Sequence, residues 1–241
     1  MKLLRIFYKS KFVCFLLKSF SSSFLFFKIE EVKSVENVKE KNIRLESKMN
    51  ELRSNPSLDL SSLKINDDDL NLILRFIIET NSNQYQQLVL RDNQLTAIGI
   101  EKLVQQFLQT RTSIRNIGLS SNPLIGDRAI EHLIKLLQSD QQSITILCLH
   151  NTGITNRSVR LLADFLCPID ENQSTVILEK LYISFNRSIT DQCFDDLLRI
   201  IQLNRSLTLF AFQHCRLSDR IRRKLRVTAA KKRNKSFQLF D

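Results

Sequence analysis

Leu88-Val-Leu-Arg-Asp-Asn93-Gln-Leu95-Thr96 is a pattern that the chain repeats at a nearly fixed interval. Its middle leucine, Leu90, has a counterpart in each copy. These marker residues, 29 to 34 positions apart, are Leu60, Leu90, Leu119, Leu149, Ile183 and Phe212. Self-similarity at such a period is typical of repeat arrays, in which each unit is one supersecondary element.

Three residues after the marker, the repeats carry a polar or small side chain in most units. The later units have Asn93, Asn122, Thr152, Asn186 and Cys215 at this position. A short strand that turns sharply leaves backbone groups unpaired, and an inward asparagine can both donate to them and accept from them. We therefore expect these asparagines to point into the array. The glycosylation sequon that begins at Asn186 should then be unused.

Each unit continues with a residue typical of a helix start and an amphipathic segment. We expect helices near residues 67–80, 97–109, 127–138, 156–166, 191–203 and 218–233. Small residues early in the four middle helices, Gly99, Ala129, Ser158 and Cys193, favour close packing against a strand. The acids Asp67, Asp68 and Asp69 fit the positive end of a helix dipole better than a metal site. Residues 236–240 show the alternation of side chains expected of a closing strand, which would cover the last edge of the predicted sheet.

These features resemble the leucine-rich repeats of the ribonuclease-inhibitor-like class, whose unit reads L-x-x-L-x-L-x-x-(N/C/T)-x-(L/I) before a helix. The nearest copy is Ile114-x-x-Ile117-x-Leu119-x-x-Asn122, and the likeness covers residues 57–240. No unit can bury its apolar side alone, so neighbouring units should stack. The predicted fold class is α/β: a leucine-rich-repeat horseshoe of about six strand–helix repeats with a parallel sheet on its concave face.

A ligand would meet the side chains between the inward leucines, because successive residues of a strand point to opposite faces. This alternation predicts a concave binding face with a small, polar centre and aromatic residues to one side. Its candidate residues are Val89, Arg91, Asp92, Ser120, Ser121, Cys148, His150, Asn151, Tyr182, Ser184, Phe185, Gln213 and His214. Exposed aromatic anchors favour a protein partner. The alternative is that Tyr182 and Phe185 only cover their own repeat.

Enzymatic chemistry is not indicated. Cys148 and His150 share a strand face, but no oriented carboxylate or glycine-rich oxyanion loop lies nearby in the sequence. The three histidines fall in different units without metal-ligand spacing, and the chain has no C-x-x-C pair and no phosphate-binding loop. We therefore predict a non-catalytic chain without a cofactor or a metal.

Charge is concentrated at the two ends of the chain. The formal net charge is +11, yet the array between residues 57 and 217 is nearly neutral. Most of the C-terminal excess lies in residues 218–235, predicted to be the capping helix. Its cations are Arg220, Arg222, Arg223, Lys224, Arg226, Lys231, Lys232, Arg233 and Lys235. They either solubilise the cap or form a basic patch for nucleic acid, acidic protein or anionic membrane.

Two segments precede the repeats. Residues 1–29 form a basic and apolar tail, open to interpretation as a segment without a role, as a membrane-associating or targeting sequence, or as a secretory signal. Residues 30–56 are a charged amphipathic linker with heptad spacing, either one helix or a dimerising helix. Five cysteines, an odd number without a cluster at either end of the array, favour a reducing, cytoplasmic or nuclear compartment.

The predicted function is a protein–protein interaction module that holds a protein partner on the concave face. The resemblance brings it near the sensing arrays of intracellular immune receptors, although their nucleotide-binding domain is missing. A neutral array does not fit a ribonuclease inhibitor, which captures basic enzymes with an acidic surface. The alternatives are weak binding of nucleic acid or acidic membrane through the tails, or GTPase activation through Arg91.

Overall fold

The computed structural model describes residues 22–80, 85–110, 112, 114–139, 144–168, 177–232 and 236–241. It divides the chain into two compact units, Met1–Ser47 and Lys48–Asp241. In the first unit the helix α3 (Ser22–Glu51) begins; on it Val38 is exposed, whereas Leu45 is buried. The boundary predicted between tail and linker, after residue 29, falls inside this helix. The segment contains no glycine or proline that would stop a helix. Residues 1–21 lie outside the described residues.

The second unit alternates strands and helices along the chain. Seven parallel strands form one sheet in sequence order, β1 to β7. They are β1 (Ser57–Asp59), β2 (Gln87–Val89), β3 (Asn116–Gly118), β4 (Ile146–Cys148), β5 (Lys180–Tyr182), β6 (Leu209–Ala211) and β7 (Gln238–Phe240). The predicted closing strand is β7, which pairs with β6 and brings the sheet from six strands to seven.

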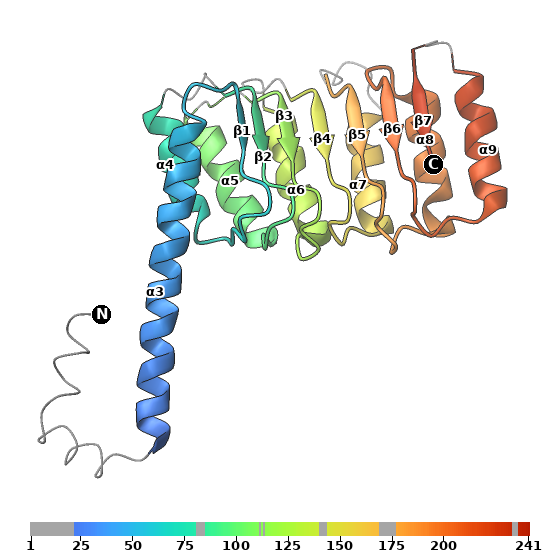
Figure 1. The fold of residues 1–241 in the computed structure, drawn as a ribbon. Coiled ribbons are helices and arrows are strands. Elements are labelled where there is room, and N and C mark those ends of the chain that lie inside the picture. The colour runs from blue at the N-terminus through green and yellow to red at the C-terminus, as the bar shows by residue number, and fades with distance from the viewer. Residues whose placement is uncertain are drawn as a thin grey trace, which may run out of the picture. The chain divides into compact units, whose positions relative to one another are not determined.

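Helices follow the first six strands and lie behind the sheet (Figure 1). They are α4 (Leu70–Glu79), α5 (Ala97–Thr110), α6 (Gly126–Leu137), α7 (Asn156–Leu166), η2 (Asp191–Cys193) with α8 (Phe194–Leu203), and α9 (Asp219–Ala230). The helix predicted near residues 67–80 begins only at Leu70, because the Asp67 side chain bonds to the next repeat, as described below. The segment predicted at 191–203 begins as a 3-10 turn before α8.

The core lies between the sheet and the helices. All six marker residues are fully buried, as is the strand residue two positions before each of them. The register pairs Leu88 with Ile117, and Ile117 with Leu147, so equivalent leucines of successive units stack in rows. The small residues predicted at the helix starts are buried as well. This is a repeating, solenoid-like α/β architecture.

An asparagine ladder joins one repeat to the next. Asn122 Nδ2 donates to the carbonyls of Leu90 and Leu119 at 2.9 Å, and its Oδ1 accepts from Leu95 N–H at 3.1 Å. Asn93 and Asn186 likewise bond to the repeat before their own. Their Nδ2 atoms donate to Leu60 O and Leu149 O, and their Oδ1 atoms accept from Ile65 N–H and Thr152 N–H. The prediction of inward asparagines is confirmed. Asn186 is 2% exposed, so its sequon offers no accessible amide to a glycosyltransferase.

The other ladder residues act as their chemistry predicts. The Thr152 hydroxyl donates to Leu149 O, at 2.9 Å, within its own unit. The thiol of Cys215 lies 3.5 Å from Ile183 O, which makes it a weak donor to the preceding unit. Threonine thus does part of the work of asparagine, and cysteine mainly fills the space.

A second ladder runs along the helix starts. Asp67 accepts from both the backbone N–H and the hydroxyl of Thr96 in the next repeat, and Asp127 does the same for Thr155. Asn156 accepts from Thr190 N–H in turn. The expectation that Asp67 serves its own helix dipole is therefore corrected: its carboxylate binds the following unit, and α4 begins three residues later.

Candidate binding face

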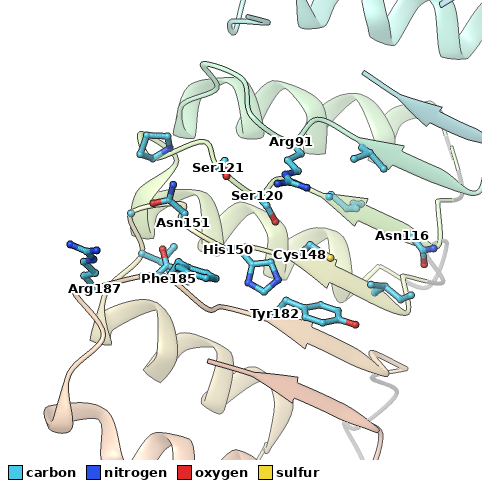
Figure 2. Close-up of a pocket in the computed structure, with 18 of the residues that line it drawn as sticks. Arg91, Asn116, Ser120, Ser121, Cys148, His150, Asn151, Tyr182, Phe185 and Arg187 are labelled. Carbon is cyan, nitrogen blue, oxygen red and sulfur yellow. The ribbon is translucent and has the colours of Figure 1, made fainter. Parts of the chain in front are cut away.

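The face of the sheet opposite the helices carries a hollow, and we call this side the strand face (Figure 2). The hollow has a volume of about 1060 Å³ and is lined by strands β2 to β5 and the loops that follow them. Nine of the predicted face residues line it. They are Val89, Arg91, Ser120, Ser121, Cys148, His150, Asn151, Tyr182 and Phe185.

The other four predicted residues lie elsewhere. Asp92 is exposed and accepts a 2.7 Å hydrogen bond from the Ser62 hydroxyl. Gln213 and His214 are exposed beyond the hollow. Ser184 was wrongly predicted to be accessible, since it is fully buried. In the strand register it lies between His150 and Gln213, and a short side chain between two long ones is covered by them.

Sequence reasoning missed part of the lining. Gln87, Asn116 and Ile146 lie one alternation step before the predicted set, at the first residue of β2, β3 and β4. Extending the alternation backward from Leu88, Ile117 and Leu147 would have found them. Pro123, Gly153, Arg187 and Ser188 come from the loops after the strands, where no two-residue periodicity applies.

Aromatic rings cluster on one side of the hollow. The ring centroids of His150 and Tyr182 are 5.3 Å apart in an edge-to-face arrangement, and His150 also meets Phe185 at 6.4 Å. Phe185 stacks on His214, with centroids 4.4 Å apart. Phe185 is 51% exposed, so this cluster presents an aromatic surface to solvent rather than closing a core.

Phe185 also has an unusual backbone conformation. One residue in each repeat, two positions after the marker, has a left-handed backbone, with φ between 51° and 63°. The others at this position are Ser62, Asp92, Ser121, Asn151 and His214. Short polar residues tolerate this region, whereas a bulky side chain there is strained. Strained residues of this kind concentrate at functional sites.

Electrostatics argue against catalysis by Cys148 and His150. Burial raises the pKa of the Cys148 thiol to about 11, which leaves it protonated at neutral pH. Burial and the charge of Arg91 lower the pKa of His150, against an opposing effect of the Ser184 backbone. His150 is therefore neutral at pH 7. Cys148 is therefore not a thiolate nucleophile, and His150 is not an imidazolium cation that could stabilise a thiolate.

We expect Cys148 to react slowly with iodoacetamide, because only the thiolate is a nucleophile. A pKa raised from 9.0 to about 11 lowers the thiolate fraction at pH 7.5 about 100-fold. Alkylation followed by peptide mass spectrometry should show slow modification of Cys148 in the folded protein and faster modification in urea. Equal rates in the two states would contradict the protonated thiol.

Four of the nine basic residues predicted for the capping helix have specific contacts in the described part of the chain. Arg222 donates to Cys215 O at 2.6 Å, Arg226 pairs with Asp241 at 2.8 Å, and Lys232 donates to Asn204 O at 2.7 Å. Lys224 lies over the ring of Phe194. Arg220, Arg223 and Lys231 are exposed, while Arg233 and Lys235 lie outside the described residues. Arg222 thus contacts its own repeat, Lys224 and Lys232 contact the preceding repeat, and Arg226 contacts Asp241 after β7.

In the part of the chain that the structure describes, no group of three or more His, Cys, Asp or Glu is arranged to hold a metal ion. None of the described helices is both long and apolar enough to cross a bilayer. A scan against protein-family models and a search of curated proteins find no match to this chain.

Proposed function

We propose that residues 57–240 are a leucine-rich-repeat array of the ribonuclease-inhibitor-like class and that its strand face binds a protein partner without catalysis. The asparagine ladder supports the repeat class, because it satisfies the backbone at the same turn of successive units. The free thiols of Cys148, Cys167, Cys193 and Cys215 support a reducing compartment, the cytoplasm or the nucleus.

Phe185 carries the proposal of partner binding. Folding alone favours a short polar residue at its left-handed position, as four sister repeats have, while the fifth has His214. A half-exposed phenylalanine there costs backbone strain and places an aromatic ring at the edge of the hollow. Aromatic side chains with little rotamer freedom concentrate binding energy at protein interfaces. A role in covering its own repeat would not require this residue in this conformation.

The substitution Phe185→Asn separates these two roles. Asparagine suits a left-handed backbone, so relief of strain should offset the lost ring stacking, and the free energy of unfolding should stay within about 1 kcal/mol of wild type. Partner binding should fall by at least about 30-fold, because an anchor at an interface is worth about 2 kcal/mol or more. Tyr182→Ala should weaken binding in the same direction.

The measurement is affinity capture from native extract on the full chain, followed by titration of the recovered partner. Ile98→Asn is the matched control, since Ile98 is equally exposed, at 56%, but lies on α5 behind the sheet. We expect it to keep full binding. A partner that Phe185→Asn retains would refute the strand face as the site. Capture that instead falls steeply between low and physiological salt would indicate the basic helix.

A further inference from the structure

The hollow on the strand face has a one-sided charge. Two arginines, Arg91 and Arg187, line it, and its described lining contains no aspartate or glutamate. Several arginines on the helix layer are paired with carboxylates: Arg157 lies 2.6 Å from Glu131, Arg128 lies 3.5 Å from Glu101, and Arg199 pairs with Asp164. Among the described residues Arg91 and Arg187 have no such carboxylate. The hollow is therefore positive, although the array as a whole is close to neutral.

Arg91 is the cation nearest the centre of the hollow. It follows β2 and lies beside Ser120, on the same side of the sheet as Cys148 and His150, whereas Arg187 lies at the rim near Phe185 and Asn151 (Figure 2). In the strand register Arg91, Ser120 and His150 occupy one row across three neighbouring units. Ser120 is short and almost fully covered, so Arg91 and His150 are the two longer side chains of this row that line the hollow.

His150 adds an unused hydrogen-bonding atom. Its Nδ1 is buried and has no hydrogen-bond partner among the described residues. Buried polar atoms are usually paired, so this one calls for a partner that the chain does not supply, either a water molecule or a ligand group. Beside it, the rings of Tyr182 and Phe185 offer an apolar surface for an adjoining side chain.

We propose that the hollow receives an extended segment of the partner protein that carries a carboxylate for Arg91 and, next to it, an apolar or aromatic side chain for Tyr182 and Phe185. Arginine binds a carboxylate through two parallel N–H donors, which fixes direction as well as charge. This inference rests on the proposed partner binding and specifies its chemistry. The carboxylate is that of an Asp or Glu side chain within the segment, and a chain end is the alternative that the test distinguishes.

The test is selection from a library of random 12-residue peptides on the full-length protein. Peptides enriched by the wild type should contain acidic and aromatic residues, and Phe185→Asn should abolish their binding. Synthetic copies with amidated and with free C-termini then separate the two sources of the carboxylate. Loss of binding on amidation indicates a chain end, and unchanged binding indicates a side chain.

The charge reversal Arg91→Glu should lower the affinity for the selected peptides by about 30-fold, because it removes an ion pair and adds a repulsion between like charges. Used as the selecting protein, this variant should enrich Lys and Arg instead. Arg75→Glu is the matched control, since Arg75 is exposed on α4 outside the hollow, and should change affinity less than two-fold. Circular dichroism melting checks that each variant is folded.

The outcomes separate the two ideas. Peptides that depend on Phe185 but show no acidic preference and no response to Arg91→Glu would overturn the carboxylate inference and leave partner binding on the strand face intact. Peptides that bind without dependence on Phe185, or no enrichment over the bare support, would count against both.

Discussion

Replacing Asn122 by alanine is expected to lower the free energy of unfolding by about 3 kcal/mol. Asn122 is fully buried, and its amide bonds to the carbonyls of Leu90 and Leu119 and to the N–H of Leu95. Alanine leaves these backbone groups without partners in a dry interior, and each such group costs about 1–3 kcal/mol. Partial relaxation of the turn keeps the total below the sum of the separate losses.

Ser120→Ala is the control for this substitution. Ser120 lies two residues away in the same repeat, yet its side chain points to the strand face, so we expect a loss of only a few tenths of a kcal/mol. Urea unfolding of both variants measures the difference. Equal midpoints would mean that the asparagine ladder does not hold successive repeats together.

Replacing Gly153 by alanine is expected to destabilise the protein by about 3 kcal/mol or more. Gly153 has φ +74°, which L side chains rarely adopt, and a Cβ there would lie 2.3 Å from Pro123 O of the preceding repeat. That oxygen belongs to the backbone and cannot rotate away, so the loop itself must shift. Both residues line the hollow, and we expect the shift to weaken partner binding as well.

Gly126 provides the matched comparison. It too is left-handed, with φ +61°, but an added Cβ would meet nothing within 4 Å. Gly126→Ala should therefore cost only the conformational penalty, about 1–2 kcal/mol. Chemical denaturation of the two variants isolates the steric contact between repeats. If both lose the same stability, the close approach of Gly153 to Pro123 does not exist in solution.

Much of the first half of each repeat was predictable from the sequence. Leu119 and Asn122 are buried as their spacing requires, because a two-residue alternation and one turn need only local information. The same alternation correctly placed Cys148, His150 and Tyr182 on the strand face. It stopped one step short of Gln87, since the outward positions were counted forward from Leu88 only, and Gln87 is the first residue of β2.

The tertiary structure decided accessibility and electrostatics. Ser184 and Ser120 occupy outward positions but are covered by longer neighbours from adjoining repeats, which single-strand alternation cannot show. The role of Asp67 was hidden for the same reason, because its partner Thr96 belongs to the next unit. In the sequence Arg222 and Arg226 have no visible partner, whereas in the fold Arg222 donates to Cys215 O and Arg226 pairs with Asp241.

The sequence by itself determined the period, the inward leucines, the ladder asparagines and the order of strand and helix. The period is visible as a repeated pattern, and the other three follow from spacing within about ten residues. Only the tertiary structure decided which side chains a ligand can reach, how Phe185 is strained and why Arg91 has no internal carboxylate. These depend on neighbours about thirty residues away along the chain. Stacking brings them into contact, and their size and charge, rather than any local pattern, set what the strand face presents.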